Sequence, residues 1–359
     1  MGEESTLGAT ARLLRCAVAL TLCSHAIACE ASPPPEFSSP AAHSAEVEVW
    51  QARRAAELRE PDSWLSVVGL FWLRSGENTI GSDPRMDVVL PGDDVPPFMG
   101  TLTLRGQGSF EFAYAPGVNP PASPSGLSGI PGQADNISGR PEIDPGQAHE
   151  MRDDAGRNPG EGEPTAGGAD VVRFRVDSPE GGLVFRWGSL SWFVIERYGE
   201  YAIRIRDSAS TALAEFHGLE AFPVREEWRI LGRFRPYDPP REIAAPNVLG
   251  IPSTSTSPGA VVFRKDGREF RLDVTGEPDA RQLFLVFGDE TNGKDTYAGG
   301  RFLSVEAPGE GGWIVIDFNR AYNPPCVFTP YATCPVPPEQ NKLPIRIEAG
   351  EKMYYGAGH

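Results

Sequence analysis

The feature that most limits what this chain can fold into is a long series of short apolar segments, each bounded by glycine, proline or aspartate. Apolar segments of about four to eight residues between turn residues are typical of β-strands. The 40 glycines and 35 prolines favour turns and loops over long helices. We therefore predict an all-β fold with mostly antiparallel strands.

The expected strands follow one another without a repeated spacing, which argues against a propeller or a solenoid. A two-sheet sandwich or a partly closed barrel, built from one or two β halves, fits such a series. Residues 201–206 alternate apolar side chains with arginine, which predicts one face in water. The strands are expected at 64–73, 79–80, 88–90, 101–104, 110–114, 171–176, 182–187, 192–198, 201–206, 228–235, 260–263, 270–274, 283–287, 302–305 and 313–318.

The N-terminus has the pattern of an export signal. Arg12 and Arg15 precede an apolar run at 16–27, which is too short to span a bilayer and suits a signal peptide. The run leads through small residues to Cys29, as in a bacterial lipobox, so Cys29 is the expected lipidation site. Ala26 stands where a lipobox usually has leucine, so an ordinary signal cleavage nearby is the alternative.

These patterns divide the chain into segments. Residues 1–29 are the expected signal peptide with its lipobox, and 30–43 form a tether rich in proline and serine. The β domain is expected at 44–356, beginning with one short amphipathic helix at 46–59. Residues 116–168 have no aromatic side chain and no apolar period, which predicts a disordered insertion. We expect an exported protein of the cell envelope, attached to a membrane by a lipid anchor only.

The charge excludes one class of partner. There are 49 acidic and 33 basic residues, and the formal net charge is −16. Such a chain repels phosphate backbones, so we expect no binding to nucleic acid.

The histidines do not predict a metal or cofactor site. His25, His43, His149 and His359 fall in the signal, the tether, the insertion and the last position, and only His217 lies in the expected body. A catalytic zinc usually takes more than one imidazole, so we predict no metal and name no cofactor. His217 has apolar neighbours, which favours a packed structural histidine over a general base.

The expected mature domain keeps two cysteines, Cys326 and Cys334, eight residues apart in a proline-rich loop. In an oxidising envelope such a pair predicts a disulfide.

The most distinctive strings lie in the C-terminal third: DETNGKDTYAGGR at 289–301, DFNRAYNPPC at 317–326, and the cysteine and proline string at 333–341. Together with 62–73, they resemble the bacterial family of domains of unknown function 1684 (DUF1684), from about Glu46 to the C-terminus apart from the insertion. The family is uncharacterised, so the resemblance implies no activity and no cofactor. Relatives without an export signal also carry the two cysteines, which keeps a thiol or metal role open.

The same C-terminal strings are the predicted ligand site. Their prolines hold the backbone rigid while amide and hydroxyl groups supply donors and acceptors. The alternative is that the asparagines cap turns and have a purely structural role. Arg301 could bind a carboxylate or phosphate of a ligand, or pair with Asp317 or Glu351. The candidate ligand-binding residues are Thr291, Tyr297, Arg301, Asn319, Tyr322, Asn323 and Asn341.

Three functions are compatible with this sequence. The first is a non-catalytic lipoprotein domain that binds a small polar ligand or a cell-wall fragment. The second is a hydrolase with Asp289 and Glu351 as acid and base, and Tyr322 or the asparagines stabilising charge. The third is a structural assembly module, favoured if the C-terminal loop is buried without a cavity.

Overall fold

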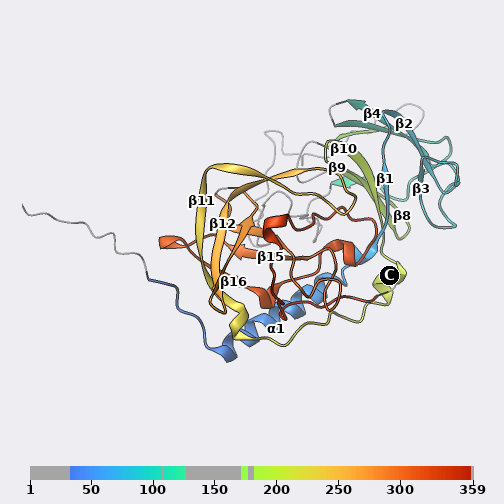
Figure 1. Cartoon of the computed structure of the whole chain (residues 1–359). Helices are drawn as coiled ribbons and strands as arrows, with labels where there is room; N and C mark the ends of the chain where they lie inside the picture. Colours follow the sequence, from blue (N-terminus) through green and yellow to red (C-terminus); the bar gives the residue numbers. More distant parts are fainter. Residues whose placement is uncertain (1–32, 107, 127–170, 177–181, 278, 357–359) are drawn as a thin grey trace, which may run out of the picture. The chain divides into compact units, whose positions relative to one another are not determined.

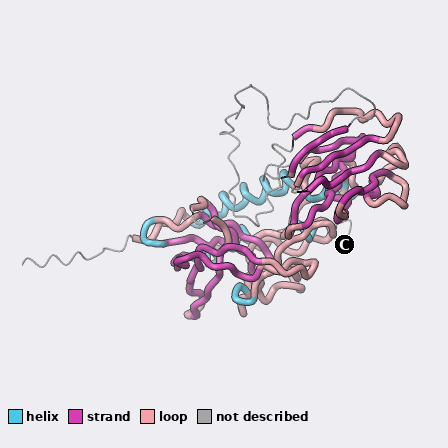
Figure 2. Tube along the Cα trace, turned by 90° about the horizontal axis from the view of Figure 1, so that it is seen from above, coloured by secondary structure: helices cyan, strands magenta, loops and turns pink. Residues whose placement is uncertain are grey.

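The computed structural model describes residues 33–106, 108–126, 171–176, 182–277 and 279–356. Strands, magenta in Figure 2, dominate this part of the chain, and a single long helix lies among them. The prediction of a mostly antiparallel β fold is confirmed, and the described residues form no closed barrel.

The N-terminal half of the chain builds two five-stranded sheets (Figure 1). The first has the order β1-β10-β9-β8-β6, with β1 (Val67–Trp72), β6 (Ser125–Gly126), β8 (Leu183–Trp187), β9 (Leu190–Arg197) and β10 (Glu200–Asp207). The second has the order β3-β2-β4-β5-β7, with β2 (Gly76–Gly81), β3 (Val88–Val89), β4 (Gly100–Gly106), β5 (Ser109–Tyr114) and β7 (Val171–Arg175). The pairs are antiparallel except β2 with β3, which is parallel.

One hydrophobic core joins these two sheets. Leu102 and Phe112 of the second sheet lie in it with Phe185 and Trp192 of the first. The rings of Phe185 and Trp192 are stacked, with centroids 4.0 Å apart. A buried side chain of this size contributes about 1.5–3 kcal/mol. The packing of the two inner faces is that of a β-sandwich.

The C-terminal half builds a four-stranded sheet and a hairpin around a second core. The sheet has the order β13-β12-β11-β16, with β11 (Arg229–Ala244), β12 (Thr254–Lys265), β13 (Arg268–Val274) and β16 (Trp313–Asp317). The hairpin pairs β14 (Gln282–Phe287) with β15 (Arg301–Glu306). A bridge between Thr275 and Phe284 continues the sheet into β14. Leu272, Leu285 and Ile316 lie in the shared core.

The helix α1 spans Pro40–Glu57, so the predicted helix at 46–59 is correct but begins too late. Ser39 caps its first turn and Pro40 occupies a position that needs no N–H donor. Residues 40–43 therefore belong to a helix and not to the tether. The shorter helices are α2 (Thr211–Ala214), η1 (Trp64–Ser66), η4 (Glu226–Trp228), η5 (Glu310–Gly312), η6 (Phe318–Arg320), η7 (Pro325–Val327) and η8 (Glu339–Asn341).

A third core cluster connects the two halves of the chain. Trp64, Leu65 and Val67 pack there with Phe284 and Phe302. The two sets lie more than 200 positions apart in the printed sequence. Strand β1 of the first sheet and the β14–β15 hairpin are thus held together by one cluster of apolar side chains.

The prediction that one face of residues 201–206 lies in water is wrong. Arg204 and Arg206 are buried, with exposed fractions of 0% and 2%. The guanidinium of Arg204 lies 4.7 Å from the ring centre of Trp64, and that of Arg206 lies 5.1 Å from the ring centre of Phe193. Arginine can be covered in this way because its planar cation stacks on aromatic rings.

Some predicted segments lie outside the described residues. These are the signal peptide with Cys29, the start of the tether, and most of the predicted insertion at 116–168. Among the helices of the described ranges, none combines the length and apolar character that a membrane span requires.

Candidate functional site

Arg301 is at the centre of the predicted C-terminal site. Its side chain is fully buried, and its Nη2 lies 2.8 Å from Oδ2 of Asp289. The guanidinium also donates to the backbone carbonyls of Ile347 (2.9 Å), Ala349 and Glu351 (3.5 Å). Burial lowers the pKa of Arg301, while the carboxylate of Asp289 opposes that shift. Its partner is therefore Asp289, and not the side chain of Asp317 or Glu351.

The carboxylate of Asp289 also accepts hydrogen bonds from its own loop. Its Oδ1 accepts hydrogen bonds from the backbone N–H of Thr291 at 2.8 Å, from the Thr291 hydroxyl at 2.6 Å and from the N–H of Ile347 at 3.2 Å. The hydroxyls of Thr291 and Thr296 lie 2.8 Å apart. With Asp289 9% exposed and Thr291 fully buried, this cluster holds the loop in shape and has no face for a ligand.

Glu351 belongs to a second cluster with α1. Its Oε1 accepts a hydrogen bond from Nε of Arg54, and its Oε2 accepts one from the backbone N–H of Asn323 at 2.7 Å. The guanidinium of Arg54 lies 4.4 Å from the ring centre of Tyr322. The Asn323 amide donates to the carbonyl of Lys352 at 2.7 Å, while its buried Oδ1 has no partner among the described residues.

Asn341 and Asn319 connect backbone segments and do not join either cluster. Oδ1 of Asn341 accepts the N–H of Asp273 at 2.7 Å, and its Nδ2 donates to the carbonyls of Asp273 and Val286 at 2.8 and 2.9 Å. Asn319 makes the same reciprocal pair with the backbone of Arg225. Both amides satisfy strand and loop backbone, which is the alternative role expected from the sequence.

The structure therefore brings together Asp289, Thr291 and Arg301 in one cluster, and Tyr322, Asn323 and Glu351 in another. Every carboxylate oxygen in them already accepts a hydrogen bond from an N–H or hydroxyl of the chain. A general acid or base must exchange a proton with a ligand, and these groups are occupied.

Tyr297 lies apart from these clusters and beside the two cysteines. Burial, and then the charges of Cys326 and Cys334, raise the pKa of Tyr297 to about 12. The cysteines are buried as two thiols and are not joined in a disulfide, contrary to the prediction. The backbone N–H of Cys326 donates to Sγ of Cys334 at 3.2 Å, and the N–H of Cys334 donates to Sγ of Cys326 at 3.3 Å.

The predictions for His217, expected to be packed, and for His43, expected in the tether, are both wrong. His217 is exposed, because Phe216 takes the inward position beside it. His43, assigned to the tether, is 1% exposed, and its Nε2 lies 2.8 Å from Oδ2 of Asp317. The helix start signal at Ser39 and Pro40 could have placed His43 in the folded part. No group of three or more metal-ligating side chains occurs in the described part of the chain.

Replacing His43 with alanine is expected to lower the free energy of unfolding by about 1.5–3 kcal/mol. The reason is that the change removes a buried hydrogen bond to a carboxylate. His217→Ala, at an exposed position, is the matched control and should stay within about 0.5 kcal/mol. Urea unfolding followed by circular dichroism measures both. Equal effects of the two changes would contradict a stabilising role for His43.

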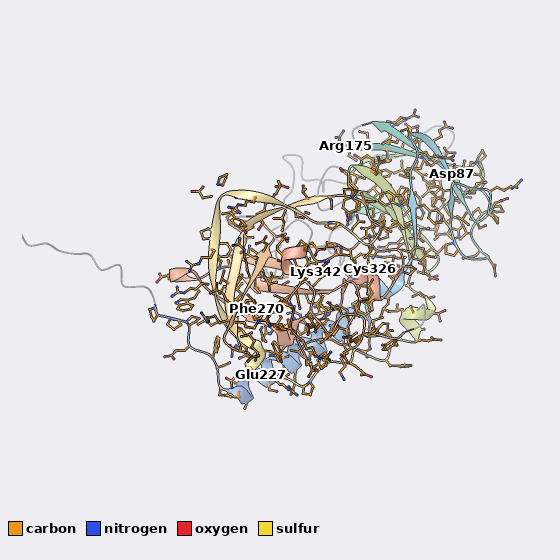
Figure 3. All side chains as sticks on the ribbon, viewed as in Figure 1. Asp87, Arg175, Glu227, Phe270, Cys326 and Lys342 are labelled. Carbon is orange, nitrogen blue, oxygen red and sulfur yellow. The ribbon has the colours of Figure 1, made fainter. Side chains whose placement is uncertain are left out.

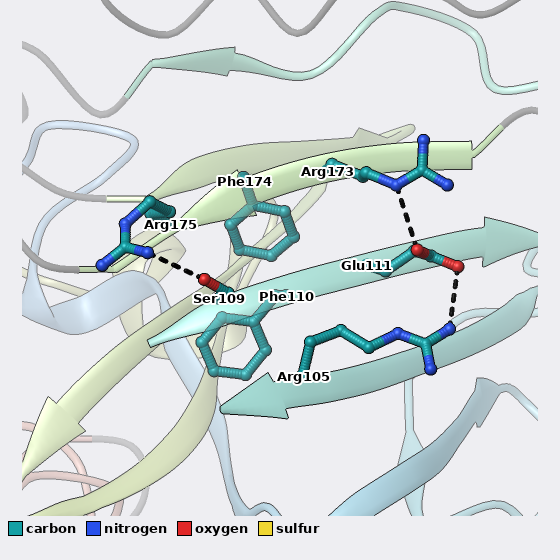
Figure 4. A pocket seen from close by; sticks show the side chains of 7 residues that line it. All are labelled: Arg105, Ser109, Phe110, Glu111, Arg173, Phe174 and Arg175. Carbon is teal, nitrogen blue, oxygen red and sulfur yellow. Dashed lines mark hydrogen bonds and ion pairs between the residues drawn. The ribbon is translucent and has the colours of Figure 1, made fainter. Parts of the chain in front are cut away.

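A pocket that the sequence did not indicate lies on the second sheet (Figure 4). It has a volume of about 380 Å³ and is formed by β4, β5 and β7. Phe110 and Phe174 contribute to its lining. Its polar side chains are Arg105, Ser109, Glu111, Arg173 and Arg175.

Glu111 organises the arginines of this pocket. It accepts a hydrogen bond from Arg105 at 3.0 Å through Oε1 and another from Arg173 at 3.1 Å through Oε2, as Figure 4 shows. The hydrogen bond from Arg105 is the main reason that the pKa of Glu111 is lowered. Arg175 donates to the hydroxyl of Ser109 at 2.9 Å. With three arginines and one glutamate, the lining has an excess of positive charge.

Comparison with known proteins finds a family match in the C-terminal part of the chain. Residues 214–352 match the family model described as "Protein of unknown function (DUF1684)". This segment is similar to the DUF1684 family. The resemblance recognised from the sequence is thereby confirmed over 214–352, whereas the predicted part before 214, including 62–73, lies outside the match. The DUF1684 segment contains both polar clusters and the two cysteines, whereas the pocket of Figure 4 precedes it.

Among solved structures, the chain is similar to an uncharacterized protein of Haloarcula marismortui, determined by solution NMR. The two are 28% identical over 38% of this chain and 77% of that chain, with a TM-score of 0.33. No curated protein matches. The DUF1684 description and this structure state no activity.

Proposed function

We propose that this chain is a non-catalytic binding protein of the cell envelope, held by a lipid anchor at Cys29. It binds a small ligand carrying carboxylate or phosphate groups, such as a cell-wall fragment. The proposed ligand site is the arginine-lined pocket on β4, β5 and β7. It replaces the C-terminal loop that we predicted from the sequence as the ligand site. The observation that carries the proposal is the convergence of Arg105 and Arg173 on Glu111, with Arg175 in the same lining.

The pocket lining is positively charged, whereas the chain as a whole is negatively charged. The whole chain carries a formal charge of −16, so an anion is repelled at long range from most of its surface. Arg105 and Arg173 are 57% and 63% exposed, and each uses only part of its five-donor guanidinium on Glu111. Their remaining donors match the geometry of carboxylate or phosphate oxygens.

The hydrolase hypothesis has less support. Asp289 and Glu351 are both buried, and both are occupied by arginine and backbone N–H groups. Protonating or freeing Asp289 would leave the buried guanidinium of Arg301 without its counter-charge, and freeing Glu351 would do the same to the partly buried Arg54. The same observations favour a structural role for the C-terminal loop.

Replacing Arg105 and Arg173 together with glutamine is expected to weaken anion binding by at least about tenfold. Exposed arginine contacts are screened by solvent, so a dissociation constant on the order of 1 mM is expected for the unchanged protein. Glu111→Gln should strengthen binding, because it removes a carboxylate that competes with the ligand. NMR titration with inorganic phosphate and with muramyl dipeptide, at low and at physiological salt, measures these effects.

The matched control is the double change Arg53→Gln and Arg85→Gln, which alters net charge equally at exposed arginines outside the pocket. Binding should then stay close to that of the unchanged protein. N-acetylglucosamine, which is neutral, should not bind. If neither anion shifts the resonances of β4, β5 and β7, or if both double variants weaken binding equally, the proposed site is wrong.

A further inference from the structure

The segment from Cys326 to Pro335, here called the strap, connects parts of the chain that are distant in sequence. The hydroxyl of Thr329 donates to the carbonyl of Val67 in β1 at 2.9 Å. The hydroxyl of Tyr198, in the turn after β9, donates to the carbonyl of Thr333 at 2.9 Å. The strap therefore joins the first sheet of the sandwich to the C-terminal half.

The strap also reaches the loop between β11 and β12. The N–H of Val248 donates to the carbonyl of Cys334 at 3.0 Å, and Asn247 forms a bridge with Pro335. Cys334 is thus one of the points at which the strap is attached, and Cys326, labelled in Figure 3, is its other end.

Each cysteine sulfur lies close to the backbone of the other cysteine. Each Sγ lies 3.2 or 3.3 Å from the backbone nitrogen of the other cysteine. A backbone nitrogen is three bonds from its own sulfur, so a rotamer change can bring the sulfurs to bonding distance. Each sulfur accepts one backbone N–H, which stabilises negative charge on that sulfur, and the thiolate is the reactive form.

The surroundings favour a reaction between the two thiols over a metal site. Cys326 and Cys334 lie in the third core cluster with Phe284, Phe302 and the partly buried Tyr297. Because the pKa of Tyr297 is raised to about 12, its hydroxyl stays neutral over the pH range in which thiols ionise. No third cysteine, histidine or acidic side chain joins the pair within the described residues to complete a metal site.

We propose that Cys326 and Cys334 are a site of reversible oxidation, at which a small-molecule disulfide converts the pair into an internal disulfide that locks the strap. One thiolate attacks the small disulfide, forms a mixed disulfide and releases one thiolate of the reagent. The second cysteine thiolate then attacks the mixed disulfide and releases the other. Two protein thiols are oxidised, the reagent gains two electrons, and two protons leave the protein and yield two reagent thiols.

Locking the strap restricts the connection between the sandwich and the C-terminal half. The ring closed by the disulfide contains Thr329 and Thr333, which make the contacts to Val67 and Tyr198. Local opening of the strap must then break these contacts without the freedom of an open chain. In the oxidised protein, the contacts of the strap with Val67 and Tyr198 should therefore open less often.

The test equilibrates the full-length protein with oxidised and reduced glutathione in varied ratio, followed by acid quench, alkylation and peptide mass spectrometry. A peptide linked through Cys326 and Cys334 is expected, formed in one two-electron transition. Hydrogen exchange on the same samples should show that backbone N–H groups of the strap and of Val248 exchange at least about tenfold more slowly after oxidation. Exchange in the β12–β13 hairpin serves as the internal control and should not change.

Cys334→Ser is the matched variant. It should take up one glutathione at Cys326, form no internal disulfide and show no slowing of exchange in the strap. Alkylation of both cysteines of the unchanged protein at every glutathione ratio would overturn the proposal. An internal disulfide without slower exchange would overturn the lock. If Cys334→Ser fails to fold, mass spectrometry and hydrogen exchange of the unchanged protein still test both the disulfide and the lock.

Discussion

Asp289→Asn is expected to lower the free energy of unfolding by about 3–5 kcal/mol, which is the usual effect of breaking a buried ion pair. The change leaves Arg301 fully buried without its counter-charge. Asparagine keeps one oxygen, so its NH2 group must face either the guanidinium of Arg301 or the three donors from Thr291 and Ile347. Urea denaturation monitored by tryptophan fluorescence and circular dichroism measures the effect.

The control for this prediction is Asp295→Asn, which breaks an exposed ion pair with Arg346 and should change stability by no more than about 1 kcal/mol. A loss below about 1 kcal/mol for Asp289→Asn would show that the pair does not stabilise the fold.

Asn341→Ala should lower the free energy of unfolding by about 3–4 kcal/mol. One amide side chain binds the N–H and carbonyl of Asp273 in β13 and the carbonyl of Val286 in β14. Removing it leaves three buried backbone groups without partners, each worth about 1–3 kcal/mol with partial relief by water.

Asn119, which is exposed, provides the matched control, and Asn119→Ala should have little effect. Hydrogen exchange adds a local test, since faster exchange after Asn341→Ala should begin at the N–H of Asp273. If both asparagine variants unfold at the same urea concentration, the role assigned to Asn341 is wrong.

Much of the fold was accessible from the sequence because strands carry a local signal. Alternation and bounding turns located β5 and β14 within a few residues, whereas β11 continues nine residues past the predicted 228–235 and β12 begins six residues before the predicted 260–263. The start of α1 was missed because it depends on Ser39 and Pro40 and not on apolar period. The buried arginines of β10 were missed because alternation shows two faces and cannot show that Trp64 covers the second.

The candidate site was predicted in part. Six of the residues singled out in the C-terminal third lie in two clusters as internal partners, namely Asp289, Thr291, Arg301, Tyr322, Asn323 and Glu351. Tyr297, Asn319 and Asn341 lie apart from these clusters. A sequence shows that Arg301 and Asp289 can pair, and cannot show that both are buried. The pocket was not predictable, because Glu111 and Arg173 become neighbours only through the register of β5 against β7.

The contacts of α1 have a consequence for how the chain reaches its native state. Arg54 binds Glu351 across 297 positions, and His43 binds Asp317 across 274. Contacts of such separation form late, because a long loop must close before they contribute. Helix α1 is synthesised early, but most of the chain must be available before Arg54 can pair with Glu351 or His43 with Asp317. For the export proposed above, this order would leave the early segment without the partners that could fold it before it crosses a membrane.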